Sequence, residues 1–224
     1  MLSEVELLYV DDAVAVVSKP SGQLVHPGWA RGEPTTMAWL RDRLGERVFP
    51  VHRLDRATSG ALVMARSPEA ARALSQAWPH VAKTYLALVR GTPPANVELD
   101  HPVRKELKGP ERVEARTDIA FIARSLRDRC SLVWARPHTG RLHQIRRHLK
   151  HLSHPILGDT RYGHGSDNRH YRETWGLHRL ALHAARLRFP HPRHEETIEV
   201  TAELPDDLAQ VLRDLGLPHQ MAQL

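Results

Sequence analysis

The sequence has 224 residues, of which 41% are hydrophobic and 26% are charged, as is typical of a soluble globular protein. No apolar run reaches the roughly 18 residues that a membrane span requires. The N-terminus lacks the pattern of a signal peptide, so we expect a cytoplasmic protein that binds no membrane. The 32 lysines and arginines exceed the 26 acidic residues, and the net charge of +6 favours a polyanionic partner such as RNA or DNA. A basic composition without a binding role is the alternative.

The first half of the chain predicts short strands and two helices. Residues 7–28 predict two strands around the turn at Asp11 and Asp12, followed by a break at Lys-Pro-Ser-Gly, residues 19–22. Residues 36–45 predict a short helix, and the run ALVMA at 61–65 is typical of a fully buried strand. Ser67 and then Pro68 predict the start of a second helix, which continues to residue 78.

The second half continues with strands, loops and helices in no regular alternation. We expect strands over residues 83–91, 130–137, 177–189 and 197–204, and helices over residues 141–152 and 205–216. Residues 98–117 predict a charged loop or hairpin, and residues 158–176 predict a polar, glycine-rich loop. This order favours an α+β fold on a mixed or antiparallel sheet. No dinucleotide or P-loop motif is present, so we expect no nucleotide cofactor.

The stretch VHRLDRATSGALVMARS, residues 51–67, places one carboxylate between two arginines. Asp55 lies between Arg53 and Arg56, and a Thr-Ser-Gly turn follows before the apolar run. Neighbouring guanidinium groups favour the ionised carboxylate, which suits a nucleophile or a base rather than a general acid. A structural salt bridge at a turn is the alternative.

The predicted helix at 141–152 combines an apolar stripe with basic residues. The stripe consists of Leu142, Ile145, Leu149 and Leu152. Arg146 borders this stripe and requires an acidic partner, because a desolvated, unpaired guanidinium is costly; Asp55 is a candidate. Arg147, Lys150 and His151 should face solvent, as a basic edge suited to phosphates or as an ordinary solvated helix face.

Cysteine and histidine spacing argue against a metal site. Cys130 is the only cysteine, which excludes an internal disulfide and a thiolate cluster, and we expect a buried, small hydrophobic residue there. The histidines at 143, 148, 151 and 154 point in different directions on a helix, without a paired acid or cysteine, so we expect no metal. Tyr85 is either a core aromatic or a side chain that stacks on a base.

Taken together, these segments resemble a known family. The stretch HRLDRATSG, residues 52–60, resembles the signature of the RluA-type RNA pseudouridine synthases: His-Arg-Leu-Asp, two residues, then Thr-Ser-Gly. Four further blocks that resemble the family occur in the same order as in the family, at residues 18–28, 83–91, 138–159 and 177–189. Ser18 departs from the asparagine that often precedes Lys-Pro in the family. The sequences of these blocks are most similar to those of the branch that modifies tRNA.

The resemblance implies a role for particular residues. Asp55 matches the catalytic aspartate, and Arg146 matches the basic residue that pairs with it. Tyr85 matches the tyrosine that stacks on the flipped uracil, and Leu182 the apolar residue beneath the uracil ring. Arg53 matches the arginine that enters the RNA helix where the target nucleotide has left. We expect the RNA-binding side chains to be Arg53, Arg56, Arg141, Arg147 and Lys150.

The resemblance also implies a fold and a reaction. The expected fold is a single catalytic domain over residues 1–224, without a separate N-terminal RNA-binding domain. It has a mixed, mainly antiparallel sheet, flanking helices and a central cleft. The reaction breaks the C1′–N1 bond of a uridine, rotates the uracil and rejoins it through C5, with no metal or other cofactor. Asp55 attacks the ribose or the base, or removes a ribose proton, and the sequence does not choose among these routes.

Four hypotheses follow for the function. The first is a monomeric synthase that acts on tRNA near the acceptor stem, with substrate selection by residues 158–176. The second is a synthase for a ribosomal RNA uridine. The third is a catalytically silent RNA-binding or RNA-folding protein, against which the intact Asp55 argues, because a carboxylate repels phosphate. The last is a hydrolase with His52 as base, which lacks a second carboxylate at a clear spacing.

Overall fold

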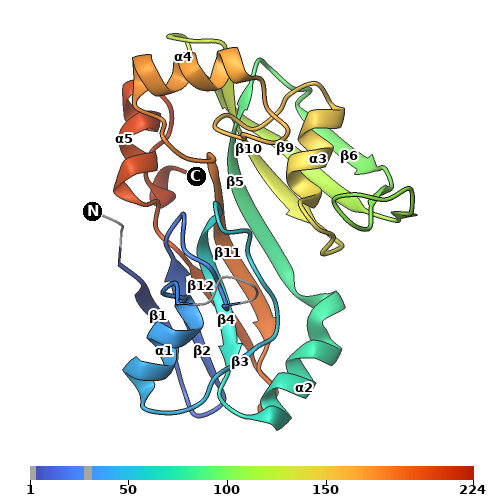
Figure 1. Ribbon diagram of the computed structural model, residues 1–224, viewed down its shortest axis with the longest axis vertical. Coiled ribbons are helices and arrows are strands. Elements are labelled where there is room, and N and C mark those ends of the chain that lie inside the picture. Colours follow the sequence, from blue (N-terminus) through green and yellow to red (C-terminus); the bar gives the residue numbers. More distant parts are fainter. Residues whose placement is uncertain (1–3, 28–31) are drawn as a thin grey trace. The chain divides into compact units, whose positions relative to one another are not determined.

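A computed structural model describes residues 4–27 and 32–224. The last residue of the family block at 18–28 therefore lies outside the described residues. The chain forms two compact units (Figure 1): the first comprises Met1–Ala82 and Ala184–Glu203, and the second Lys83–His183 and Leu204–Leu224. Among the described residues, no helix has the length and apolar character needed to cross a membrane.

The first unit is built on a mainly antiparallel sheet. Its neighbouring strands are β1 (Glu6–Val10), β2 (Val14–Lys19), β4 (Ser59–Ala65) and β11 (Leu182–Pro190), of which all but the first two residues belong to this unit. In addition, β3 (Phe49–Pro50) pairs with β4, and β12 (Thr197–Thr201) pairs with β11. The pairs β1–β2, β2–β4, β3–β4 and β11–β12 are antiparallel. The two strands expected around Asp11 and Asp12 are confirmed as β1 and β2.

The strand β4 is buried along its whole length, as its continuous apolar sequence predicts. On one of its faces, Val63 packs in a core cluster with Val16, Phe189 and Leu74. Leu74 belongs to α2 (Pro68–Ala77), which therefore covers this face. Burial on both faces gives the residues just before β4 a rigid support.

The helices of the first unit begin where capping chemistry predicts. The Ser67 hydroxyl accepts a hydrogen bond from the Ala70 N–H at 3.1 Å, so the predicted start of α2 is confirmed. The Thr35 hydroxyl caps α1 (Thr36–Leu44) in the same way, and Gly45 ends this helix in the left-handed conformation, with φ of 71°. A short 3₁₀ turn, η1 (Trp78–His80), follows α2.

The neighbouring strands of the second unit are also antiparallel. Its strand order is β5 (Ala82–Arg90), β10 (Cys130–Pro137), β9 (Arg116–Arg124) and β6 (Asn96–Asp100), and β7 (Val103–Arg104) pairs with β8 (Arg112–Val113) in a separate hairpin. The helices are α3 (Gln144–His151), α4 (Gly165–Trp175) and α5 (Asp206–Asp214), with a final 3₁₀ turn, η2 (Met221–Gln223). The predicted α+β fold on a mainly antiparallel sheet is confirmed.

The expectation of a loop over 158–176 is wrong, because Gly165–Trp175 forms the helix α4. This helix has few apolar residues, and tertiary contacts hold it in place. Tyr171 is buried, and the Asn168 side chain accepts a hydrogen bond from the Gly158 N–H and donates one to the Asp159 carbonyl, both at 2.9 Å. The strand β9 was likewise not predicted, since its sequence shows no clean alternation of apolar and polar residues.

Candidate active site

Asp55 lies in a tight turn directly before β4. The Thr58 N–H donates to the Asp55 carbonyl at 3.0 Å, and the Asp55 side chain is half-buried. Gly60 then has a φ of 112°, and a Cβ at that position would lie 2.2 Å from the Ala184 carbonyl oxygen. Only glycine fits this close approach. The glycine of the Thr-Ser-Gly sequence is therefore a structural requirement of the strand that follows the Asp55 turn.

We expect Gly60→Ala to destabilise the protein by about 1–3 kcal/mol, because the new methyl group would overlap backbone atoms that cannot move independently. Gly45→Ala is the matched control: Gly45 also has a positive φ, but a Cβ there meets nothing within 4 Å. Urea unfolding of both variants separates the steric effect from the cost of the backbone conformation. Equal stability of the two variants would contradict the close-packing argument.

A buried lysine fastens the Asp55 turn to the loop after β2. Lys19 is completely buried, and its ammonium group donates to the carbonyls of Pro20 at 2.8 Å, Gln23 at 2.8 Å and Arg56 at 3.1 Å. These hydrogen bonds satisfy a charge that would otherwise be costly to bury. Lys19 is thus a positioning residue for the turn, and it was not among the site residues predicted from sequence. The Lys-Pro pair in the block at 18–28 was the available signal.

Further hydrogen bonds join the same two loops. The Ser21 hydroxyl donates to the Ala57 carbonyl at 2.8 Å, and the Gly22 N–H donates to the Arg56 carbonyl at 2.8 Å. The Arg56 guanidinium donates back to the Gly22 carbonyl at 2.8 Å and forms an ion pair with Glu33 at 3.0 Å. Arg56 therefore braces the turn although it is exposed, and Arg53 is exposed as well.

We expect Lys19→Met to lower the free energy of unfolding by about 1.5–3 kcal/mol, because buried carbonyls lose a charged donor. Catalytic turnover should fall as well, since the Asp55 turn loses its attachment. Lys108→Met, at an exposed lysine, is the control. Denaturant unfolding and an activity assay measure the two effects. If Lys19→Met is as stable and active as this control, the bracing role is refuted.

His52 supports the turn from its other side. Its Nε2 atom accepts a hydrogen bond from the Val63 N–H at 3.0 Å, and its ring stacks on Trp78 with the centroids 4.4 Å apart. A ring nitrogen that accepts a backbone hydrogen bond has no lone pair left with which to act as a base. In the hydrolase hypothesis, the Nε2 atom of His52 could therefore not act as the base.

In the second unit, Arg146 forms a buried bidentate ion pair with Asp159. Its Nε and Nη2 atoms donate to the two carboxylate oxygens at 2.8 and 2.9 Å. The backbone N–H groups of Arg161 and Tyr162 donate to the same carboxylate at 2.9 and 3.0 Å. Burial raises the pKa of Asp159, but these hydrogen bonds and the Arg146 charge outweigh it and bring the pKa below its usual value.

The ion pair fixes the orientation of the Arg146 side chain. Because Asp159 occupies the Nε and Nη2 edge of the guanidinium, the plane and direction of the whole group are determined. Arg146 also lies over the Tyr162 ring, with its Cζ atom 5.2 Å from the centroid. Sequence reasoning predicted the need for an acidic partner but did not find Asp159. The signal was the Gly-Asp pair that ends the block at 138–159.

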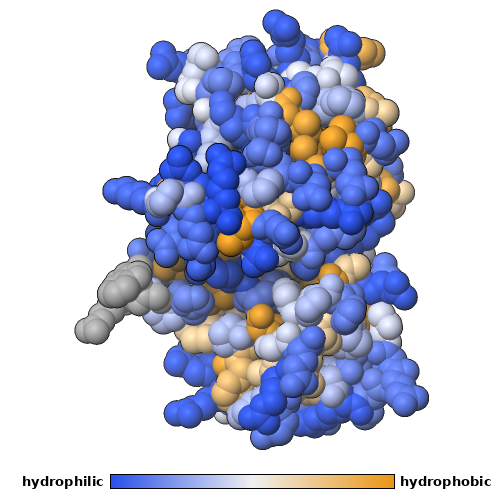
Figure 2. All heavy atoms as spheres, turned by 90° about the vertical axis from the view of Figure 1, so that its right-hand side faces the viewer, coloured by the Kyte–Doolittle hydropathy of each residue, from blue (hydrophilic) through white to orange (hydrophobic). Residues whose placement is uncertain are grey.

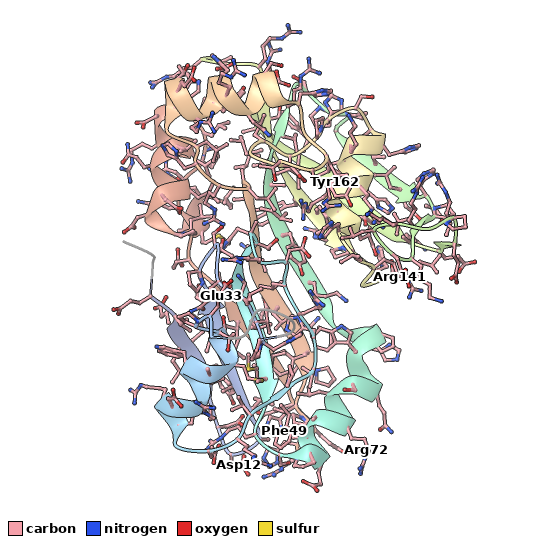
Figure 3. All side chains as sticks on the ribbon, in the orientation of Figure 1. Asp12, Glu33, Phe49, Arg72, Arg141 and Tyr162 are labelled. Carbon is pink, nitrogen blue, oxygen red and sulfur yellow. The ribbon has the colours of Figure 1, made fainter. Side chains whose placement is uncertain are left out.

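The remaining basic residues predicted to bind RNA differ in their surroundings. Arg147 is half-buried rather than directed to solvent: it donates to the Tyr162 hydroxyl at 3.0 Å and to the Arg104 carbonyl. Arg141 is exposed and donates to the Glu114 carbonyl at 3.0 Å, and Lys150 is exposed. Figure 3 labels Arg141 and Tyr162. The RNA-binding role of all these residues stays a prediction.

Tyr85 and Leu182 lie on strands of the sheet. Tyr85, on β5, is half-buried and pairs with Ala135 on β10, while Leu182 begins β11 and is buried. Burial lowers the pKa of Lys83, two residues before Tyr85. Asp55 belongs to the first unit, whereas Tyr85, Arg146 and Leu182 belong to the second. That these side chains share one site stays a prediction.

One group of possible metal ligands occurs among the described residues: Asp12, His191 and His194. The Nδ1 atom of His191 accepts from two backbone N–H groups, and its Nε2 atom lies 3.1 Å from an Asp11 carboxylate oxygen. Asp12 is bound by Arg193 at 2.6 Å. Because His191 and Asp12 already have protein partners, the group has the character of a hydrogen-bonded turn rather than of a metal centre.

The chain was also compared with known proteins. A family model described as RNA pseudouridylate synthase matches residues 13–151, a range that includes the Asp55 turn, Tyr85 and all of α3. The chain belongs to this family.

Relatives and solved structures of the RNA pseudouridylate synthase family match nearly the whole chain. A protein from Haemophilus ducreyi named tRNA pseudouridine synthase C is 38% identical, covering 95% of this chain and 96% of its own length. One of the same name from Pasteurella multocida is 42% identical, covering 88% and 90%. The structure of human RNA pseudouridylate synthase domain containing 4 has a TM-score of 0.77 at 25% identity and covers 95% of this chain and 94% of its own.

Proposed function

We propose that this enzyme isomerises a uridine to pseudouridine in tRNA, in the region of the acceptor stem. The observation that carries the proposal is the 38–42% identity, over most of both chains, with proteins named tRNA pseudouridine synthase C. The aspartate of the family signature is present as Asp55, in a turn braced by Lys19 and Ser21. A ribosomal RNA uridine is the second candidate substrate.

In this proposal the target uridine leaves the RNA stack before it reacts, which costs a few kcal/mol. Tyr85 stacks on the extruded uracil, and Leu182 packs beneath its ring. Arg53 enters the space that the nucleotide has left. These contacts recognise the base by shape and hold its C1′–N1 bond next to the Asp55 carboxylate.

Asp55 performs the chemistry as a carboxylate. It attacks C1′ of the ribose or C6 of the base, or it removes a ribose proton, and each route requires the ionised form. Arg146 is the proposed partner of this charge, and Asp159 holds Arg146 in a single orientation. After the C1′–N1 bond breaks, the uracil rotates and C5 bonds to C1′; C5 then loses its proton and N1 gains one, so that the product is an isomer of the substrate. We propose that the protein works as a cytoplasmic monomer and needs no metal or other cofactor.

The test uses total tRNA and ribosomal RNA from a strain that lacks its own synthases of this type. Both RNAs are treated with the wild-type protein and with Asp55→Asn, and new pseudouridines are mapped by carbodiimide-induced reverse-transcription stops. A stop in tRNA that depends on Asp55 is the expected result. A stop in ribosomal RNA alone would mean that the substrate is ribosomal RNA rather than tRNA. No stop in either RNA, with RNA still bound, would favour the silent RNA-binding protein.

A further inference from the structure

The second unit contains a cavity of about 350 Å³ between the β7–β8 hairpin and α3. Its lining includes the basic side chains of Arg104, Arg112, Arg147, Lys150 and Arg161, and no Asp or Glu is among the described residues that line it. A concentration of like charges without a counter-charge is unfavourable by itself and becomes favourable when an anion enters.

The walls of this cavity are held in place by specific hydrogen bonds. Arg147 on α3 donates to the Arg104 carbonyl in the hairpin and, through Nε, to the Tyr162 hydroxyl. His148 on α3 is completely buried, and its ring nitrogens contact the His101 carbonyl and the Thr117 hydroxyl, each at 2.9 Å. The hairpin and the helix are therefore fastened together, and the basic residues between them occupy fixed positions.

Arg147 is occupied by these structural contacts, but other cations in the cavity remain available. Arg104, Lys150 and Arg161 are exposed, and none of these side chains has a hydrogen bond or an ion pair within the part of the chain that the structure describes. Arg112 donates one hydrogen bond, from Nη1, to the Pro102 carbonyl at 3.2 Å. The available groups are thus donors from the hairpin, from α3 and from the segment after Asp159.

Two stacked histidines complete one wall. The rings of His101 and His151 are 3.8 Å apart and nearly parallel, at 13°. Arg112 Nη1 lies 3.5 Å from His101 Nε2. Burial, together with the neighbouring Arg112 charge, lowers the pKa of His101, which favours the neutral ring, and the stacked pair adds a flat surface to the wall. The face that carries α3 is largely hydrophilic, with small apolar patches (Figure 2).

We propose that this cavity binds a phosphodiester group of the RNA backbone. This proposal rests on the proposed function, which supplies RNA as the substrate. Arginine groups bind phosphate oxygens in pairs of parallel hydrogen bonds. Contacts of this kind fix the register of the nucleic acid without reading its sequence. The cavity would therefore position the RNA, while the Asp55 turn and Tyr85 would act on the target nucleotide.

The test measures RNA binding by the double variant Arg104→Gln/Arg161→Gln in an Asp55→Asn background, which prevents turnover. Neither substitution removes a hydrogen bond that holds the walls, because both residues contribute to them only through backbone groups. Lost phosphate contacts should weaken tRNA binding by about tenfold at low salt. The slope of log K against log salt concentration should become shallower by about 1 to 2.

The matched control is Arg43→Gln/Arg72→Gln, which removes the same charge from exposed positions on α1 and α2 that do not line the cavity. This variant should keep the affinity and the salt slope of its parent. Equal losses in both double variants would show a general charge effect and overturn the assignment of the cavity. Circular dichroism and urea unfolding confirm that each variant is folded.

The same substitutions in the active protein separate this proposal from the proposed function. We expect the cavity variant to raise KM for tRNA with kcat nearly unchanged, since backbone binding is equal in the ground and transition states. If the wild-type protein forms pseudouridine and the cavity variant keeps its KM, affinity and salt slope, the cavity assignment is wrong and the proposed function stands. If the wild-type protein modifies no RNA, the proposed function fails.

Discussion

Asp55→Asn should lower kcat by more than about 10³-fold, because a neutral amide can act neither as a nucleophile nor as a base in the proposed reaction. The affinity for RNA should stay nearly unchanged, since the carboxylate contributes chemistry rather than attraction to phosphate. Single-turnover kinetics with tRNA and a filter-binding titration measure the two quantities separately.

The control for this variant is Asp42→Asn, which makes the same chemical change at an exposed residue of α1. It should keep full activity. Unfolding curves should show that the turn is intact in Asp55→Asn, because Lys19, Ser21 and His52 hold it through backbone atoms of its neighbours. Turnover by Asp55→Asn within about tenfold of the wild-type rate would remove Asp55 from the mechanism.

Asp159→Asn should destabilise the protein by about 3–5 kcal/mol at pH 7, because it removes the buried carboxylate that binds the Arg146 guanidinium through two hydrogen bonds. Activity should also fall, since Arg146 would no longer be held in a single orientation. The exposed Asp100→Asn is the control and should change the free energy of unfolding by less than about 0.5 kcal/mol. Urea unfolding gives both values.

The destabilisation caused by Asp159→Asn should depend on pH. The pKa of Asp159 is lower in the folded protein than its usual value. The ion pair therefore stabilises the folded state fully above the unfolded pKa, about 3.9, and this contribution is lost as the pH falls through the folded pKa. Wild type and Asp159→Asn should thus differ most near neutral pH and converge in acid below about pH 4. A difference that is constant down to acid would show that the charge of Asp159 is not responsible.

Local sequence patterns were sufficient to predict the elements that do not depend on contacts with distant residues. Ser67 and Pro68 determine the start of α2 through capping and a fixed φ, and neither depends on distant residues. The run ALVMA requires burial on both faces, so it predicted the central strand β4. The helix α4 could not be found in this way, because its stability comes from the buried Tyr171 and from Asn168 bound to Gly158 and Asp159.

The sequence by itself identified the family, because the spacing in HRLDRATSG is specific, and it predicted Asp55 as the reacting carboxylate. It also showed that Arg146 needs an acidic partner. Only the tertiary structure identified Asp159 as a partner, and only it revealed the buried Lys19 that holds the Asp55 turn. Hydrogen bonds between residues far apart in the chain depend on how strands and loops pack. The sequence therefore indicates which polar groups need hydrogen-bond partners, whereas the folded structure determines which residues provide them.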